Sequence, residues 1–332
     1  MLRVLTYHRI AELNSMPELN PRMISATPAA FEQQMRFVAR HYRAVGMEEV
    51  LEAAERRREL AGKPLMITFD DAYRDFAETA LPILQRYRLP VTLFVPTAFP
   101  DHTERWFWWD KLYCAITESA RPQLHVVRVG QLNLQTHAER MTSMKKLQTH
   151  IKGMEHSSAM ALVDATCEQL GFKPSARKTV LGWSELRGLA KAGVTMGAHT
   201  RTHPIMTRLT PAELRDEVAG SWQDLQHEIG EVPPIFCYPA GGHDEMVVQV
   251  LREEGIKLAF TTRKGQNDLR RADLLRLRRQ NITPRTSLAI FRIRLMRWAS
   301  YLDAWRHRKT YNPAAIGEMP AAMTSEFETG TP

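Results

Sequence analysis

Two acidic residues and two histidines have the types and spacing that a metal-dependent hydrolytic site needs. Asp70 and Asp71 are adjacent, and His199 and His203 lie four residues apart in the run His-Thr-Arg-Thr-His. The Asp71 carboxylate and the two imidazoles suit zinc or another late first-row divalent ion, and they leave a coordination position for water. The structural alternative is that the aspartates cap a helix and that His203 only begins a loop. Each motif alone leaves both interpretations open.

Each of these polar positions follows an apolar run that predicts a buried strand. Residues 65–69 are continuously apolar up to Asp70, and residues 194–198 lead to His199 in the same way. Such runs are typical of parallel strands that are covered on both faces. The polar positions at the ends of the runs are His8, Asp70-Asp71, His199 and Pro239-Ala240-Gly241. Because sites in α/β barrels form at the carboxyl ends of the strands, we expect these residues to meet there.

The segments between the runs predict helices, which gives an α/β alternation. Thr27-Pro28 has the composition of a helix start, and an apolar stripe with Phe31 and Val38 follows it. Further strands are expected at residues 4–7, 91–95, 235–238, 257–262 and 274–282. Strands that alternate with helices in this way predict a parallel sheet.

Residues 101–180 interrupt the alternation. The aromatic run Trp106-Phe107-Trp108-Trp109 opens a predicted helix, residues 126–134 suggest a small hairpin, and the rest has a helical character. The apolar positions look too sparse for an independent core, so we interpret this segment as an insertion into one domain that spans residues 1–311. The remaining residues, 312–332, have the composition of a disordered tail.

Composition narrows the class of protein. Hydrophobic residues make up 44% and charged residues 25% of the 332 residues, which is ordinary for a globular protein. The net charge of +8 is modest, and no nucleic-acid-binding motif accompanies it, so we expect no nucleic-acid partner. The three cysteines are Cys114, Cys167 and Cys237, which do not suggest a disulfide framework. Without a signal peptide or an apolar membrane-spanning segment in the sequence, the expected location is the cytoplasm.

Three motifs together resemble the polysaccharide deacetylases with a NodB-like domain, of the carbohydrate esterase 4 type. They are Thr-Phe-Asp-Asp at residues 68–71, His-Thr-Arg-Thr-His at 199–203 and Phe-Cys-Tyr-Pro-Ala-Gly-Gly at 236–242. Residues 7–10 (Tyr-His-Arg-Ile) and 91–97 are also similar to members of that family, notably exopolysaccharide and poly-N-acetylglucosamine deacetylases. The resemblance covers roughly residues 2–282, with the insertion poorly matched. It implies a distorted (β/α) barrel that hydrolyses the acetamide of N-acetylated sugars or, less often, acetyl esters.

The resemblance also implies roles for individual residues. Asp71, His199 and His203 correspond to the metal ligands, with zinc expected and cobalt, nickel, iron or manganese as alternatives. Asp70 corresponds to the general base. The backbone N–H that stabilises the oxyanion belongs here to Ala240, where the family usually has tyrosine.

The chain departs from the family pattern at three places. Phe236 stands where an arginine often orients the base, Thr261-Thr262-Arg263 replaces the usual Asp-x-Trp, and the late histidine that serves as general acid is absent. His8 is the candidate acid. The resemblance implies this role, because in poly-N-acetylglucosamine deacetylases with the Tyr-His opening that histidine protonates the leaving amine. The alternative for His8 is a hydrogen-bonded histidine in the barrel mouth.

Arg279 is the candidate replacement for the missing arginine. It shares one face of the expected last strand with Leu275, Leu277 and Asn281, so an inward-facing Arg279 would reach Asp70. Solvated surface charge is an equal alternative. The candidate substrate contacts are Tyr7, Trp108, Pro239 and Gly241. The aromatic run could stack on sugar rings or belong to the core, and His243 and Asp244 are expected at the surface as helix-capping residues.

Residues 287–309 predict a basic amphipathic helix. Its apolar stripe runs through Leu288, Phe291, Leu295, Trp298, Leu302 and Trp305, and arginines crowd the rest of the segment. Such a helix either packs over the barrel, which we favour, or lies on an anionic membrane surface. Peripheral association with the inner face of the membrane would suit a lipid-linked sugar precursor.

The residues and the resemblance together predict a metal-dependent N-deacetylase whose partner is an N-acetylated carbohydrate. Two alternatives stay open. One is a carbohydrate-binding protein of the same fold with impaired catalysis, which the altered motifs suggest. The other is an amidase that acts on a small non-sugar amide.

Overall fold

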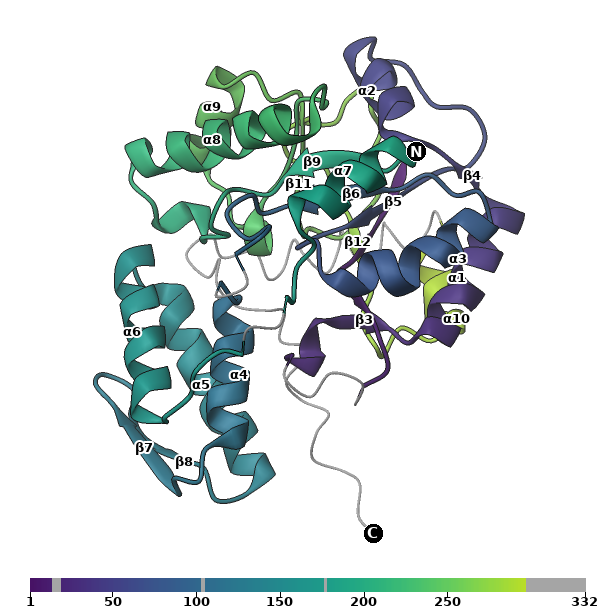
Figure 1. Cartoon of the computed structure of the whole chain (residues 1–332). Helices are drawn as coiled ribbons and strands as arrows, with labels where there is room; N and C mark the ends of the chain where they lie inside the picture. Colours follow the sequence, from purple (N-terminus) through teal and green to yellow (C-terminus); the bar gives the residue numbers. More distant parts are fainter. Residues whose placement is uncertain (14–18, 103–104, 176–177, 297–332) are drawn as a thin grey trace.

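A curled parallel sheet forms the centre of the molecule (Figure 1). The computed structural model describes residues 1–13, 19–102, 105–175 and 178–296. The strand order is β11-β10-β9-β6-β5-β1-β12, and β4 also pairs with β5. The strands are β1 (Arg3–Tyr7), β4 (Arg43–Ala44), β5 (Pro64–Phe69), β6 (Thr92–Val95), β9 (Thr195–Ala198), β10 (Ile235–Cys237), β11 (Leu258–Phe260) and β12 (Gln280–Asn281). All of these pairs are parallel, as the alternation of strands and helices predicts.

The segment before β12 connects the two ends of this sheet. Leu277 forms a parallel bridge with Phe260 of β11, and its backbone exchanges hydrogen bonds with Ala259 and Thr261. The chain then pairs with β1 through Gln280 and Asn281. The strand expected at residues 274–282 is therefore only two residues long, because its first half is bonded to β11 instead. The sheet curls into the predicted distorted (β/α) barrel.

Helices surround the barrel (Figure 1). They are α1 (Pro28–His41), α2 (Met47–Glu55), α3 (Leu81–Arg86), α7 (Trp183–Lys191), α8 (Pro211–Ile229), α9 (Glu245–Glu253) and α10 (Leu288–Arg294). The expected helix start at Thr27-Pro28 is confirmed, because the Thr27 hydroxyl accepts a hydrogen bond from Ala30 N–H. Thr210 and Glu213 form a capping box at the start of α8. Two short strands, β2 (Arg9–Ile10) and β3 (Ile24–Ala26), pair beside the barrel.

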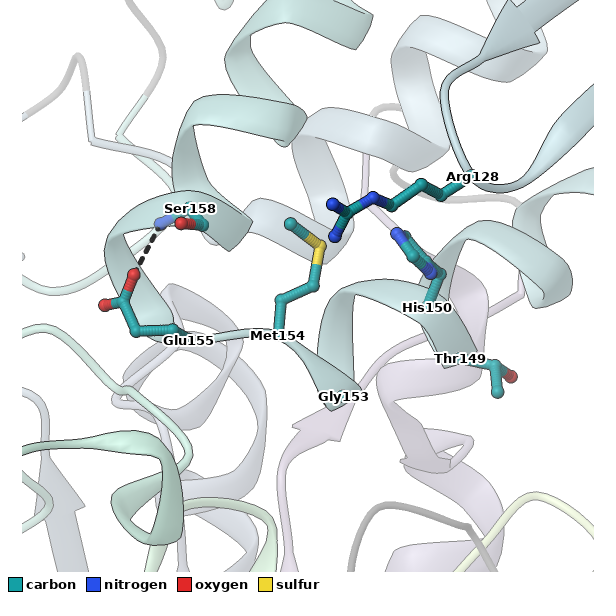
Figure 2. Close-up of a pocket in the computed structure, with 7 residues that line it drawn as sticks. All are labelled: Arg128, Thr149, His150, Gly153, Met154, Glu155 and Ser158. Atoms are coloured by element: carbon teal, nitrogen blue, oxygen red, sulfur yellow. Dashed lines mark hydrogen bonds between the residues drawn. The ribbon is translucent and has the colours of Figure 1, made fainter.

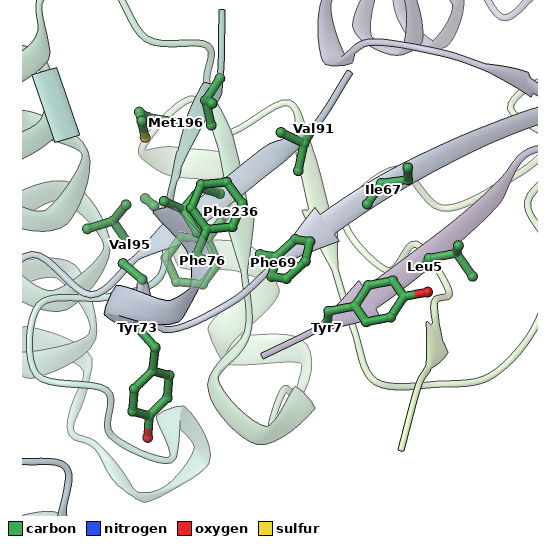
Figure 3. Packing of buried hydrophobic residues seen from close by; sticks show 14 of the residues in the cluster. Leu5, Tyr7, Ile67, Phe69, Tyr73, Phe76, Val91, Val95, Met196 and Phe236 are labelled. Carbon is green, nitrogen blue, oxygen red and sulfur yellow. The ribbon is translucent and has the colours of Figure 1, made fainter. Parts of the chain in front are cut away.

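Side-chain alternation along the strands separates two buried clusters. The outer faces carry Leu5, Ile67 and Phe236, which form one cluster with residues of the helices. Figure 3 shows part of this cluster. The opposite faces contribute Val4 and Met66 to a second cluster, which also includes Phe94, Phe260 and Leu277. Because side chains alternate with a period of two, the inward series of β5 continues from Met66 through Thr68 to Asp70. The inward series of β1 continues in the same way to Thr6 and His8.

Within the insertion, residues 105–175 form a largely separate lobe of helices with one hairpin, at the lower left of Figure 1. Its elements are α4 (Trp108–Glu118), β7 (Gln123–Val126), β8 (Gly130–Asn133), α5 (His137–Gly153) and α6 (His156–Gln169). The expectation that its apolar positions are too sparse for a core is wrong. The hairpin adds Leu124 and Leu132 to Leu112, Leu147 and Val163 of the helices, and these residues form a buried cluster. The assignment of the segment to one domain with the barrel stays a prediction.

The first part of the predicted amphipathic helix packs on the barrel. Phe291 and Leu295 are buried, and the guanidinium of Arg292 lies over the ring of Phe37. The remaining stripe and the expected disordered tail lie outside the described residues. None of the helices described here combines the length and the apolar character needed to cross a membrane.

Candidate active site

Asp71, His199 and His203 converge at the carboxyl ends of the strands. Asp71 Oδ1 lies 3.5 Å from His199 Nε2 and 3.3 Å from His203 Nε2. The two imidazole rings are 4.8 Å apart at an angle of 79°. Asp71 and His199 are buried, and His203 is 11% exposed. The loops after β5 and β9 supply these side chains, and β6 lies between the two strands. The structure thus brings together the three side chains that the sequence analysis proposes as metal ligands.

A strained backbone produces this convergence. Nine non-glycine residues in the described part of the chain have positive φ, and five of them lie at this end of the barrel. The five are Asp71 (72°), Ala72 (51°), Thr200 (64°), His203 (58°) and Ala240 (52°). Left-handed geometry costs an L-residue about 1–2 kcal/mol, and such strain clusters at functional sites. The turn at Asp71 directs its side chain to the histidines, whereas Asp70 keeps the inward direction of β5.

Hydrogen bonds fix which nitrogen of His199 faces Asp71. His199 Nδ1 lies 2.7 Å from the carbonyl oxygen of Cys237, so Nδ1 carries the proton and donates it to this carbonyl. The opposite nitrogen, Nε2, is therefore the one that faces Asp71. In the same loop the Thr200 hydroxyl accepts a hydrogen bond from His203 N–H at 3.0 Å. These contacts fix the orientation of the His199 ring and the backbone that carries His203.

The environment of Asp71 fits a divalent cation. Among the described residues neither of its buried carboxylate oxygens has a hydrogen-bond partner, and the close contacts to the imidazoles lack hydrogen-bond geometry. A buried carboxylate without a partner is costly unless a cation binds it. Burial raises the pKa of Asp71, but His199 and His203 outweigh burial and hold it well below its usual range. Burial lowers the pKa of His203, which favours the neutral form that can bind a metal.

Asp70 is paired with Arg279. Nη1 of Arg279 donates to Oδ1 of Asp70 at 2.8 Å, and Nη2 donates to Oδ2 at 2.7 Å. Both side chains are buried, and Arg279 Nε also donates to the carbonyl of Thr261. The inward orientation considered for Arg279 is therefore present, and a solvated surface position is excluded. Burial raises the pKa of Asp70, but the guanidinium outweighs burial and lowers it, which keeps the carboxylate ionised.

Cys237 is the residue of β10 that faces Asp70. The sequence analysis assigned Phe236 to the position where the family often has an arginine that orients the base. Phe236 instead lies on the outer face of β10, in the core. The Cys237 thiol lies 3.5 Å from Asp70 Oδ2 and accepts a hydrogen bond from Arg279 Nη2 at 3.0 Å. Asp70, His199 and Cys237 are also close enough to hold an ion. Because Arg279 occupies both oxygens of Asp70, the set with Asp71 is the better candidate.

His8 lies at the barrel mouth beside both aspartates. Its backbone N–H donates to the Ser25 hydroxyl at 2.9 Å, and its half-buried imidazole has no hydrogen-bond partner among the described residues. Burial raises the pKa of Asp70 and Asp71, and the cationic groups around them, His8 included, lower it. The imidazole is thus near the place where the sequence analysis requires an acid.

Trp109 forms an aromatic wall against His203, which the sequence analysis did not identify. Its ring meets the His203 ring at 4.9 Å and 69°. Phe107 stacks on Trp109 at 4.5 Å and also meets the His203 ring, at 5.8 Å. The indole N–H donates to the Tyr73 hydroxyl at 2.9 Å, and that hydroxyl donates to Asp110 at 2.7 Å. Trp108, the residue chosen from the sequence, instead packs against both the barrel core and the core of the insertion. The aromatic run gave the only signal, and it could not distinguish the two tryptophans.

Tyr7 is not available for the substrate contact that was expected of it. Its side chain is fully buried on the outer face of β1, and its hydroxyl donates to Gln34 at 2.7 Å. Pro239 and Gly241 are buried in the turn after β10. A Cβ at Gly241 would come within 2.1 Å of Thr262 Oγ1, so this position needs glycine for space and for its φ of 73°. Pro239 and Gly241 therefore shape the turn that carries Ala240.

Ala240, His243 and Asp244 follow β10 and differ in exposure and in contacts. Ala240 is exposed in the turn with left-handed φ. Asp244 caps α9 as expected, because its carboxylate accepts a hydrogen bond from Val247 N–H at 2.9 Å. The surface position expected for His243 is wrong. Its side chain is 4% exposed and stacks on Tyr238 at 5.0 Å, because the turn folds it back onto the barrel.

A hollow of about 510 Å³ on the inserted segment contains none of these groups (Figure 2). Arg128 from the hairpin turn faces His150 and Met154 across it, and Glu155 caps α6 at its other side. Its lining has a single histidine, His150, and a single carboxylate, Glu155, so it does not offer the donor set found at the barrel mouth.

A parallel barrel with an Asp-His-His cluster beside an ion-paired aspartate is the architecture of a sugar deacetylase of the NodB type. The chain belongs to the polysaccharide deacetylase family, whose sequence model matches residues 57–259. YxkH of Bacillus subtilis, a protein named as a polysaccharide deacetylase by similarity, is 19% identical over 291 residues, which cover 87% of this chain and 74% of YxkH.

Solved deacetylase structures share the fold. The Streptococcus pyogenes deacetylase PplD, in complex with acetate, has a TM-score of 0.60 and 20% identity, covering 89% of this chain and 98% of PplD. IcaB from Ammonifex degensii has a TM-score of 0.55 and 18% identity, covering 92% of this chain and 96% of IcaB. The de-N-acetylase from Aggregatibacter actinomycetemcomitans has a TM-score of 0.57 and 14% identity, covering 88% of this chain and 99% of the de-N-acetylase. At these identities the similarity establishes the fold.

Proposed function

We propose that the protein is a divalent-metal-dependent N-deacetylase that releases acetate from an N-acetylated carbohydrate. The observation that carries the proposal is the convergence of Asp71, His199 and His203 beside the Asp70–Arg279 pair. Family membership and the acetate held by PplD support it. The two-nitrogen, one-oxygen donor set suits zinc, with cobalt, nickel, iron and manganese as alternatives.

Each residue has one task in the proposed reaction. Asp71, His199 and His203 would hold the ion, which when bound polarises the acetyl carbonyl and acidifies a water molecule. Asp70, kept ionised by Arg279, accepts the proton of the attacking water. The N–H of Ala240 donates to the oxyanion that develops on the former carbonyl. His8 protonates the departing amine, so the products are acetate and the free amino sugar.

Two variants separate turnover from metal binding. Acetate release is measured on N-acetylglucosamine oligomers, with zinc and each alternative ion added. Asp70→Asn is expected to bind the ion and to lose turnover, because only the base is removed. His199→Ala is expected to lose the ion itself. His227→Ala is the control, because this side chain is 85% exposed on α8.

Two outcomes would contradict the proposal. Full activity in Asp70→Asn would remove Asp70 from the reaction. Binding of the oligomers without acetate release under any ion would instead favour the alternative of a carbohydrate-binding protein, which the altered third motif and the missing late histidine suggest. Release only from small non-sugar amides would favour the amidase.

A further inference from the structure

The loop that carries the two histidines is attached to one face of α8. Residues 200–202 lie between the proposed ligands, and polar atoms of Arg201 and Thr202 contact side chains of that helix. The contacting positions are Asp216, Glu217, Gly220 and Asp224. Residues spaced by four along a helix share a face, so these positions form a continuous strip toward the loop.

Glu217 binds the backbone of the loop. One of its oxygens, Oε2, accepts hydrogen bonds from the N–H groups of Arg201, at 2.6 Å, and Thr202, at 3.0 Å. Its other oxygen, Oε1, accepts from the Thr202 hydroxyl. Glu217 is only 8% exposed, so these bonds form where water competes little. One carboxylate therefore holds two consecutive peptide groups in place.

Arg201 adds a second attachment across the same strip. Its Nε and Nη2 donate to the two oxygens of Asp224, each at 2.9 Å, and Nη1 donates to Asp216 at 3.0 Å. The guanidinium reaches Asp224 by crossing the helix at Gly220. A Cβ at Gly220 would come within 2.6 Å of Arg201 Nε. Asp224 also accepts a hydrogen bond from Thr97 after β6 at 2.6 Å, which ties the helix to the barrel.

The two attachments hold a strained segment. Thr200 and His203 on either side of it have left-handed φ values of 64° and 58°. A backbone in this region relaxes unless its surroundings hold it, and relaxation would turn His203 away from Asp71. The α8 side chains of this strip contact Arg201, Thr202 and Thr97 rather than the proposed ligands or Asp70.

We infer that Glu217 and Gly220 are positioning residues that set the affinity of the Asp71-His199-His203 site for its divalent ion. The inference rests on the proposed function. Glu217 holds the loop in the geometry in which both imidazoles face Asp71, and Gly220 leaves the space that Arg201 needs for its bonds to Asp224. Partners that orient metal ligands typically affect metal affinity by about 10- to 100-fold.

The test measures zinc affinity by titration calorimetry on the full chain and, separately, urea unfolding in the presence of a chelator. Glu217→Ala and Gly220→Ala are expected to weaken zinc binding by about 10- to 100-fold. Glu217→Gln keeps one acceptor oxygen and is expected to lie between Glu217→Ala and the wild type. Glu228→Ala is the control on the same helix, because Glu228 pairs with Arg187 and not with the loop.

The outcomes separate the inference from its alternatives. If Glu217 only supports stability, Glu217→Ala unfolds at lower urea while the folded protein binds zinc as the wild type does, and the inference is overturned. Should Glu217→Ala fail to fold, Gly220→Ala carries the same test. A wild-type chain that binds no divalent ion refutes the proposed metal site, whereas wild-type binding with unchanged affinity in both variants refutes the positioning role alone.

Discussion

The guanidinium of Arg279 meets the carboxylate of Asp70 through two parallel hydrogen bonds of 2.8 and 2.7 Å. The two residues are separated by 209 positions in the chain, and both are buried. The segment that brings Arg279 to Asp70 is the same one that connects β11 to β12. Closure of the barrel and orientation of the proposed base are thus produced by one stretch of chain.

Loss of the Arg279 side chain should affect both stability and turnover. Arg279→Ala leaves the Asp70 carboxylate buried without its counter-charge, which should lower the free energy of unfolding by about 3–5 kcal/mol. Acetate release should fall as well, because the base is no longer oriented. Arg276→Ala is the control, since Arg276 pairs with Glu245 and Asp273 near the surface and should cost less than about 1 kcal/mol. Urea unfolding measures the free energy lost in each variant. Equal losses in Arg279→Ala and Arg276→Ala would contradict a stabilising role for the buried Arg279–Asp70 pair.

Removal of the His8 imidazole should slow the reaction without releasing the ion. A general acid contributes roughly 10²–10⁴-fold to the rate, so His8→Ala should lose turnover by this factor. Zinc binding should stay near the wild-type value, because the proposed ligands are untouched. His41→Ala, at the exposed end of α1, should be fully active. Full activity of His8→Ala in the acetate assay would remove His8 from the mechanism.

The Ala240 side chain should be dispensable, because the proposed oxyanion donor is its backbone N–H. Ala240→Gly accepts the left-handed φ of 52° without strain, so stability should stay within about 1 kcal/mol of wild type and turnover should persist. Ala240→Val places a β-branched residue at positive φ, which should cost about 1–3 kcal/mol. Kinetics and thermal unfolding of the pair test this. An inactive, well-folded Ala240→Gly would show that the side chain is required.

Trp109 should matter more to the reaction than Trp108. Its ring meets His203 edge-on, whereas Trp108 packs between two cores. Each alanine variant creates a cavity and should lose about 3–5 kcal/mol of stability. Only Trp109→Ala should also weaken zinc binding and raise KM, because it removes a wall beside a proposed ligand. Calorimetry and kinetics compare the variants under conditions in which both are folded, and identical metal affinities would count against this role.

Stability should depend on pH through Asp110. Burial raises the pKa of Asp110 to about 7, although hydrogen bonds from Tyr73 and Asn20 lower it. In the unfolded chain the value is about 3.9, so the neutral carboxyl contributes stability in full below about pH 4, and this contribution is lost as the pH rises to about 7. The loss is at most about 1.4 kcal/mol per pH unit for one proton.

Asp110→Asn removes this titration. The wild type should lose stability relative to Asp110→Asn between pH 5 and pH 7, as measured by urea unfolding at each pH. Asp164→Asn is the control, because Asp164 lies exposed on α6 and its replacement should leave the profile unchanged. Parallel pH profiles for wild type and Asp110→Asn would contradict the raised pKa.

Local patterns in the sequence predicted much of the fold and the centre of the site. Apolar runs of strand length, alternating with helical stripes, predicted the parallel sheet, and the polar residues that end those runs predicted the cluster at its carboxyl edge. The four-residue spacing of His199 and His203 predicted that they could share an ion with Asp71. The parallel sheet and the proximity of these side chains agree with the sequence, because periodicity and strand ends are properties of neighbouring residues.

The tertiary structure decided which distant residues meet. Strand alternation made an inward Arg279 conceivable, but only barrel closure brings it to Asp70. The same holds for Cys237 in place of Phe236, for Trp109 in place of Trp108, and for the burial of Tyr7. Glu217 had no signal in the sequence, because its partners are backbone N–H groups whose strained conformation leaves no pattern in residue type. A sequence sets the face on which a side chain lies, whereas the element opposite that face is selected by packing across the whole chain.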